Sequence, residues 1–183
     1  MPKTFGNLWL GVVDYNNLYK AYLKARKSKR YSSDIVKFTF GLEENLIDIQ
    51  NGLIWKQYEI DTYREFYVYD PKKRLIHAPS FRDRVVHHAL VKIIEPLFEK
   101  KFIADSFACR RGRGTHRAVC RVYDFARKAD VDFRDVYVLK CDVSKYFPSV
   151  NNRILKEVIR RTIRDKEVLW LIDKIIESGN GSE

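Results

Sequence analysis

The pattern of apolar and polar positions predicts a chain made mainly of helices. Apolar residues recur at helical spacing between Leu8 and Leu23, which fits an amphipathic helix that ends before the polar stretch KARKSKRYSS. A second helix is predicted to begin at Ser32 or Ser33, either of which can cap it, and to end near residues 51 and 52. The N-terminal region is therefore expected to be helical.

A β-hairpin is predicted over residues 63–79. The segment YREFYVYD has the composition of a strand, DPKK that of a turn, and RLIHAP that of a returning strand. Pro96 lies late in the next helix, which begins at Ser80, and predicts a kink or an end nearby. The apolar positions on the buried side of this helix are Val85, Val86, Ala89, Leu90, Ile93 and Ile94.

The last part of the chain is expected to hold three helices and one buried strand. A helix begins at Thr115 and carries apolar residues on one side. The nearly unbroken apolar run VYVLKC predicts a strand over residues 136–142 that is buried on both faces and ends on Asp142. Helices follow from about Asn151 and from about Asp165. The predicted fold class is therefore α+β.

Composition narrows the class of protein. With 183 residues and 45% hydrophobic content, the chain suits one domain or slightly more, with a real core. No apolar stretch is long enough to span a bilayer, and the N-terminus lacks the basic start and cleavage site of a signal peptide. Three cysteines without CxxC spacing fit a reducing cytosol, so we expect a cytoplasmic protein with no membrane partner.

The charge balance indicates a polyanionic partner. The chain has 35 Lys and Arg against 24 Asp and Glu, a formal net charge of +11, with 14% aromatic residues. A single basic run is usually a solvated helix face, but three in a chain of this size favour nucleic acid. The clusters are Lys20, Lys24, Arg26, Lys27, Lys29 and Arg30; Arg110, Arg111, Arg113, Arg117 and Arg121; and Arg160, Arg161, Arg164 and Lys166.

Asp142 is the carboxylate with the clearest chemical context. At the end of a buried strand it can bind a hard cation such as Mg²⁺, which proteins hold with one or two carboxylates and substrate phosphates. The alternative is an aspartate that caps the turn after the strand. The pattern D-V-S-K-Y-F-x-S-V that begins at Asp142 favours the metal site.

Three blocks in order carry a resemblance to a known family: PKKRLIHAPSFRDRVVHHAL, EPLFEKKFIADSFACRRGRGTHRAV and LKCDVSKYFPSV. From about Tyr63 to Glu183 the chain resembles the bacterial reverse transcriptases of retroelements, including those of group II introns and diversity-generating retroelements. The resemblance implies a right-hand polymerase. Residues 1–85 would be helix-rich fingers with the hairpin, 86–149 the first palm segment with part of its sheet, and 150–183 helices returning to the fingers.

The resemblance also implies a nucleotide site. Asp142, with Val143, matches the position that binds two catalytic magnesium ions, a geometry that stabilises both oxygens in phosphoryl transfer. The backbone amides of Val143 and Ser144 would receive the triphosphate, beside Tyr146. The phosphate clamp of the fingers hairpin matches Lys72, Lys73 and Arg74, and an Arg fork pairs well with phosphate oxygens.

Phe147 bears on the choice of sugar. It stands five residues after Asp142, where RNA-dependent RNA polymerases usually carry an Asp that helps hold the ribose 2′-hydroxyl. A ring there would exclude that hydroxyl, so the resemblance implies deoxynucleotide substrates. The alternative is that Phe147 packs under the palm sheet.

Five arginines are candidates for contact with nucleic acid. Arg82 and Arg84 either contact the template or pair with Asp83 and Glu95. In the segment RRGRGTH, glycines allow close approach of the backbone and arginines suit phosphates, whereas the alternative is a helix-capping loop with a basic flank. The arginines of that segment are Arg110, Arg111 and Arg113.

The chain departs from the family in one respect. Reverse transcription needs a later pair of adjacent aspartates, and no Asp-Asp pair occurs in the 183 residues. We therefore expect an N-terminal portion of an RNA-directed DNA polymerase, without the rest of the palm and the thumb, whose partners are an RNA template and primer or an RNA–DNA hybrid, and deoxynucleoside triphosphates. The alternative is a non-catalytic RNA-binding module derived from such an enzyme, maturase-like or defence-related, that binds retroelement RNA or an accessory protein.

Overall fold

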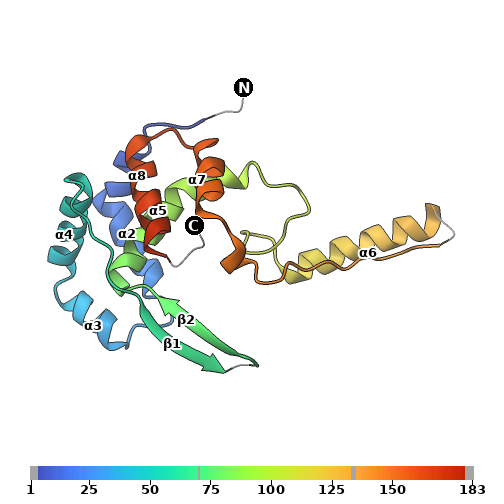
Figure 1. Cartoon of the computed structure of the whole chain (residues 1–183), viewed down its shortest axis with the longest axis horizontal. Coiled ribbons are helices and arrows are strands. Elements are labelled where there is room, and N and C mark those ends of the chain that lie inside the picture. Colours follow the sequence, from blue (N-terminus) through green and yellow to red (C-terminus); the bar gives the residue numbers. More distant parts are fainter. Residues whose placement is uncertain (1–3, 70, 133–134, 180–183) are drawn as a thin grey trace. The chain divides into compact units, whose positions relative to one another are not determined.

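The computed structural model describes residues 4–69, 71–132 and 135–179 and divides the chain into two compact units. Unit 1 comprises Met1–Glu95 and Ser149–Glu183, and unit 2 is Pro96–Pro148. Within the described ranges, none of the helices combines the length and apolar content that crossing a membrane requires. In chain order (Figure 1) the elements are α1 (Trp9–Val13), α2 (Tyr15–Ala25), α3 (Ser33–Phe40), α4 (Leu42–Ile54), β1 (Arg64–Tyr69), β2 (Lys73–Ala78), α5 (Phe81–Glu99), α6 (Thr115–Asp132), the 3₁₀ turn η1 (Phe147–Ser149), α7 (Asn152–Arg160) and α8 (Lys166–Ser178).

The first predicted helix is in fact two helices, α1 and α2, separated at Asp14. Asp14 has an extended backbone, and its carboxylate accepts a hydrogen bond from the Asn17 backbone N–H at 2.9 Å, which caps α2. The break turns the apolar face, so that Leu10 and Leu23 are exposed, contrary to the prediction. The residues of these helices that are buried are Trp9, Val12, Val13, Asn17, Leu18, Ala21, Tyr22 and Ala25.

The second predicted helix is also two helices. The prediction of its start is confirmed, because α3 begins at Ser33, but the chain breaks at Gly41 and α4 continues to Ile54. The Asn45 side chain donates to the Phe38 carbonyl at 2.9 Å across this break. Gly41, a residue of low helix propensity, lies at this corner, and the Asn45 contact is local to it.

The helix predicted from Ser80 is confirmed as α5. The Asp83 backbone N–H donates to Ser80 Oγ at 3.1 Å, and Ser80 Oγ donates to Asp83 Oδ2 at 2.9 Å. Four of its six predicted apolar positions, 85, 86, 89 and 90, are buried, whereas 93 and 94 are half-buried. Pro96 lies inside α5, and the helix ends three residues later at Glu99.

Asp83 also anchors the segment that leads from α4 to the hairpin. The Asp83 side chain is fully buried and accepts hydrogen bonds from Tyr58 Oη at 2.6 Å and the Asp61 backbone N–H at 3.1 Å. Burial, and then the hydrogen bond to Asp83, raise the pKa of the Tyr58 hydroxyl far above its usual value. The phenol is therefore a permanent donor to this carboxylate.

The predicted hairpin is confirmed as β1 and β2, which pair antiparallel from Arg64 opposite Ala78 to Tyr69 opposite Lys73. Asp70, which the sequence assigns to the turn, lies outside the described residues. The hairpin extends from the helices of unit 1 (Figure 1), and it is the one sheet among the described residues. A lone hairpin is only marginally stable and needs contacts with the rest of the fold. One such contact is the hydrogen bond between Tyr63 Oη, just before β1, and Ser178 Oγ at the end of α8, at 3.1 Å.

The predicted buried strand over residues 136–142 is wrong. These residues form no strand, and Tyr137, Val138 and Leu139 are each more than four-fifths exposed. A strand needs a neighbour to accept and donate its backbone hydrogen bonds, and the described residues place no strand beside this segment. In the described part of unit 2, no residue is buried.

The last two helices begin where the sequence predicts. The Asn151 side chain accepts from the Ile154 backbone N–H at 3.1 Å and caps α7. Asp165 caps α8, because its Oδ1 accepts the backbone N–H groups of Glu167 and Val168, each at 3.1 Å. Both are N-cap residues of the types that sequence reasoning recognises.

Asp165 also caps a second helix. Its Oδ2 accepts the backbone N–H groups of Leu8 at 2.6 Å and Trp9 at 3.0 Å, at the start of α1. Burial acts to raise the pKa of the Asp165 carboxyl, but the four backbone hydrogen bonds outweigh burial and lower it. One carboxylate therefore satisfies the free amides of two helices.

Lys56 joins the same region from the end of α4. Its Nζ lies 3.8 Å from the ring centre of Trp9 and 4.8 Å from that of Trp170, and no described atom accepts a hydrogen bond from it. Burial lowers the pKa of the Lys56 ammonium, although Glu167 and Asp165 act to raise it. Lys56 has a left-handed backbone, φ 59°, at a position after a helix that usually favours glycine.

Replacing Asp165 with alanine is expected to lower the free energy of unfolding by about 2–3 kcal/mol, since two helix caps are lost at roughly 0.5–2 kcal/mol each. Asn151→Ala is the matched control, because Asn151 caps α7 alone, and a loss of about 1 kcal/mol is expected for it. Urea unfolding followed by circular dichroism at pH 7 measures both. Equal losses in the two variants would contradict the double cap.

The contribution of Asp165 should also depend on pH. Its pKa is lower in the folded state, so its stabilisation is complete above the unfolded value near 3.9 and is lost as pH falls through the folded value. The difference in stability between the wild type and Asp165→Asn should therefore shrink between about pH 4 and pH 2. A constant difference over this range would exclude an ionised cap.

Candidate nucleic-acid interface

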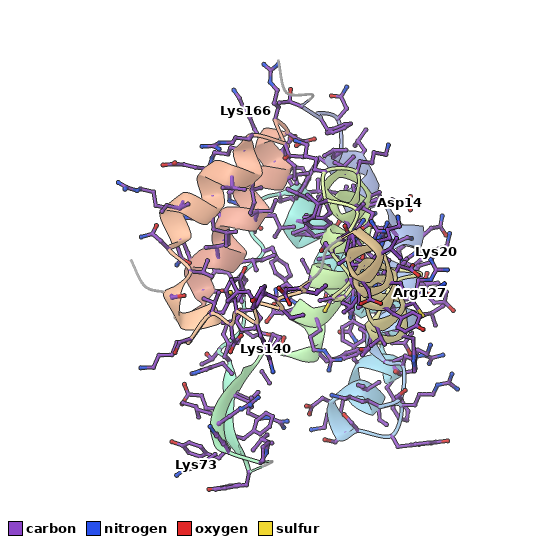
Figure 2. The ribbon with its side chains drawn as sticks, turned by 90° about the vertical axis from the view of Figure 1, so that its right-hand side faces the viewer. Asp14, Lys20, Lys73, Arg127, Lys140 and Lys166 are labelled. Atoms are coloured by element: carbon purple, nitrogen blue, oxygen red, sulfur yellow. The ribbon has the colours of Figure 1, made fainter. Side chains whose placement is uncertain are left out.

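The hairpin tip brings basic and aromatic side chains together. Lys73 Nζ lies 4.2 Å from the ring centre of Tyr67 and 5.9 Å from that of Tyr69, on one face of the hairpin (Figure 2). Lys72 and Arg74 flank Lys73 and are exposed. Cations beside exposed rings can contact phosphates and stack on bases, which fits the phosphate-binding role expected for these residues.

Residues 141–147, the part of the block around Asp142, are all exposed. Val143 is 62% and Phe147 is 84% exposed, and Asp142 and Ser144 are also exposed. The rings of Tyr146 and Phe147 meet edge to face, with centres 5.4 Å apart. The sheet of the described residues is the hairpin, so a role of Phe147 near the sugar and its packing under a palm sheet both stay predictions.

The described residues do not by themselves fit a centre for two magnesium ions. Asp142 offers one carboxylate and Val143 a backbone carbonyl. Within the described ranges, no group of three or more His, Cys, Asp or Glu side chains could hold a metal ion. Two-metal centres hold their ions roughly 3.5–4 Å apart, which needs more carboxylate ligands than Asp142 alone supplies.

Arg82 and Arg84 bind backbone carbonyls of unit 1. Arg82 donates to the Glu59 carbonyl at 3.0 Å, and its guanidinium lies 4.3 Å from the Tyr58 ring centre. Arg84 donates to the Ala25 carbonyl at 3.1 Å, at the end of α2, where a cation is favoured by the helix dipole. The expected alternative, pairing with Asp83 and Glu95, is not what the structure shows.

Arg110 organises the loop between α5 and α6. Its side chain is only 7% exposed and donates to Glu99 at 2.6–2.8 Å and to the carbonyls of Ile103 and Ser106, each at 2.9 Å. The hydrogen bond from Arg110 lowers the pKa of Glu99. Arg110 is therefore a structural residue of this loop.

Of the other two arginines in this segment, one makes an internal contact and one lies at the surface. Arg113 donates to the Ala104 carbonyl. Arg111 is exposed, and no described residue pairs with it. Of the three arginines expected to contact nucleic acid in this segment, Arg111 alone has a guanidinium without an internal partner among the described residues.

Helix α6 carries two basic residues, Arg127 and Lys128, that the sequence analysis did not single out. A hollow of about 430 Å³ is lined by Arg121, Asp124, Arg127, Lys128 and Val131. Arg121 is held by Asp105 at 2.7 Å, whereas Arg127 and Lys128 are exposed. The signal in the sequence was the helical spacing of Lys128 from Arg117 and Arg121, which Asp124 interrupts.

Arg110→Ala should loosen the loop of residues 99–113, because three acceptors, Glu99 and the carbonyls of Ile103 and Ser106, lose their shared donor. Amide hydrogen exchange in peptides covering this loop is expected to become several-fold faster. Arg111→Ala, which removes the same charge one residue away, should leave exchange there unchanged. Similar acceleration in both variants would show that charge, rather than these hydrogen bonds, holds the loop.

Several known proteins are similar to parts of this chain. No protein-family model matches the chain. The chain is 32% identical to Protein YkfC of Escherichia coli over 117 residues, which cover 62% of the chain and 30% of YkfC. It is 31% identical over 108 residues to nuclear intron maturase 1 of Arabidopsis thaliana, a mitochondrial protein, and these cover 57% of the chain and 14% of the maturase.

A second maturase of the same plant, mitochondrial nuclear intron maturase 2, is 29% identical over 145 residues, which cover 70% of the chain and 19% of that protein. The matched part of the chain thus spans less than a third of the length of each relative. The similarities nevertheless support a protein related to the reverse transcriptases of retroelements.

Proposed function

We propose that this chain is an RNA-binding module of the maturase type, derived from a reverse transcriptase. The observation that carries the proposal is the similarity to two intron maturases in a chain with a formal net charge of +11. RNA is a polyanion, and a basic protein gains affinity by releasing the counterions of the phosphates that it neutralises. Intron RNA is therefore the proposed ligand.

The hairpin supports this proposal. Its three basic residues, Lys72, Lys73 and Arg74, are exposed, and Lys73 lies beside the rings of Tyr67 and Tyr69. The cations of such a surface contact phosphates, and its rings stack on unpaired bases. Neither contact depends on the RNA sequence. Arg111 offers a further exposed cation in unit 2.

RNA binding should weaken steeply as salt rises. With four or more phosphate contacts, raising KCl from 50 to 200 mM is expected to increase the dissociation constant roughly fiftyfold or more. The measurement is fluorescence anisotropy with a labelled group II intron domain. Binding that does not depend on salt, or no binding at 50 mM, would contradict the proposal.

Substitutions of the hairpin cations test whether the hairpin contacts the RNA. Replacing Lys72, Lys73 and Arg74 together with glutamine should flatten the dependence of log Kd on log salt by up to about one unit per lost contact. Arg160→Gln is the control, because Arg160 is paired with Asp173 in the folded chain. An unchanged slope in the triple variant would place the RNA away from the hairpin.

RNA-directed DNA polymerisation is the second candidate function, favoured by the exposed positions of Asp142 and Phe147 in the block LKCDVSKYFPSV. It applies to a protein that supplies further carboxylates beside Asp142. Mg²⁺ bound there would neutralise phosphate charge during nucleotidyl transfer. Its partners would be an RNA template with a primer and deoxynucleoside triphosphates.

Primer extension separates the two functions. The 183-residue chain, incubated with Mg²⁺, deoxynucleotides and a primed RNA template, is expected to give no product above background, since Asp142 is the single candidate metal-binding carboxylate of its block. Asp142→Asn is the control. Template-dependent product that Asp142→Asn abolishes would favour the polymerase over the binding module.

A further inference from the structure

The connection between α2 and α3 is a defined turn that presents basic residues. The Lys29 backbone N–H donates to the Arg26 carbonyl, and the Ser32 N–H donates to the Lys29 carbonyl, each at 3.1 Å. Ser28 has a left-handed backbone, φ 64°, between them. Arg26 itself is held by Tyr22, whose Oη accepts from it at 2.9 Å. The residues that follow Arg26 therefore project from an ordered backbone.

The positive charge of this turn is not neutralised by its surroundings. Between Tyr15 and Ser33 the sequence has no acidic residue, and the first carboxylate beyond is Asp34. By contrast, Arg110, Arg121 and Arg160 of the other basic clusters are each paired with a carboxylate. Five exposed cations without an ion pair among the described residues lie here: Lys20, Lys24, Lys27, Lys29 and Arg30. Figure 2 shows the first of them, Lys20, at the edge of the ribbon.

A half-buried neighbour, His88, reports the same positive field. The pKa of His88 on α5 is lowered, first by burial and then by the charges of Lys24 and Arg84, with a smaller effect from His87. Arg84 lies beside the end of α2, where it donates to the Ala25 carbonyl. The cations of this region therefore reinforce one another instead of being screened by acids.

An exposed aromatic ring completes the surface. Tyr31 follows Arg30 directly and is 96% exposed, with no described contact to its ring. Exposed rings among cations are the means by which proteins stack unpaired bases while neutralising phosphates. Paired bases are already stacked inside a duplex and do not present a face to such a ring.

We propose that Lys20, Lys24, Lys27, Lys29, Arg30 and Tyr31, the α2–α3 basic surface, bind single-stranded RNA, with the cations on phosphates and one unpaired base on Tyr31. The inference rests on the proposed function and deepens it, because it names the kind of RNA and a site separate from the hairpin. Charge complementarity and the unpartnered ring select this ligand.

The ring is tested with a matched pair of variants. Tyr31→Ala should weaken binding of a labelled twelve-nucleotide oligo(U) about fivefold or more, as one base loses its stacking partner. Phe40→Ala removes a ring that is similarly exposed, at 90%, but precedes the acidic residues Glu43 and Glu44, and should change binding by less than about twofold. Tyr31→Phe should bind like the wild type, and thermal melting checks that each variant is folded.

The cations are tested with two triple variants of equal charge change. Glutamine at Lys27, Lys29 and Arg30 should weaken oligo(U) binding and flatten its salt dependence, whereas glutamine at the exposed residues Arg153, Arg161 and Arg164 should have the smaller effect. A hairpin duplex of matched length should bind without sensitivity to Tyr31→Ala.

The outcomes separate this inference from the proposed function. Equal effects of Tyr31→Ala and Phe40→Ala, equal effects of the two triple variants, or a duplex that responds to Tyr31→Ala would overturn the α2–α3 basic surface as a single-strand site. If the wild type bound intron RNA normally in that case, the proposed function would stand. A wild type that binds neither RNA would overturn both.

Discussion

The Asp165 carboxylate accepts hydrogen bonds from the first backbone amides of two helices, α1 and α8, that are far apart in the chain. Burying a charge is unfavourable unless hydrogen bonds replace its hydration, and four N–H donors do so here. Nearby, Phe5 and Ile163 form an isolated parallel β-bridge, and the Lys56 ammonium lies close to the rings of both Trp9 and Trp170. The N-terminal and C-terminal segments of unit 1 therefore meet at this carboxylate.

Local signals were enough to predict most elements of the fold. Ser80, Asn151 and Asp165 mark the starts of three helices, because each is a residue whose side chain can accept or exchange hydrogen bonds with nearby backbone amides. Local signals could not establish whether residues 136–142 form a strand. Apolar composition describes a strand that has neighbours, and whether it has them depends on residues elsewhere in the protein. The breaks at Asp14 and Gly41 were missed because helix periodicity continues across them.

In the candidate site, the sequence shows where the basic residues are, but the structure shows which of them make internal contacts. Residue type predicts positive charge equally for Arg110 and Arg111, yet the side chain of the first is bound to Glu99 and two carbonyls and the second is exposed. Arg82 and Arg84 are likewise attached to backbone oxygens. The sequence located the basic clusters, but only the contacts separate cations that support the fold from cations that face solvent.

The separation of Leu8 and Asp165 along the chain has a consequence for biosynthesis. The amide and the carboxylate are 157 residues apart, and the whole of unit 2, Pro96–Pro148, is made between them. At about 5–20 residues per second, α1 waits on the order of 8–30 s at the ribosome before its cap exists. During that interval its apolar side chains lack their final partners on α8, which makes the nascent chain a natural client for chaperones.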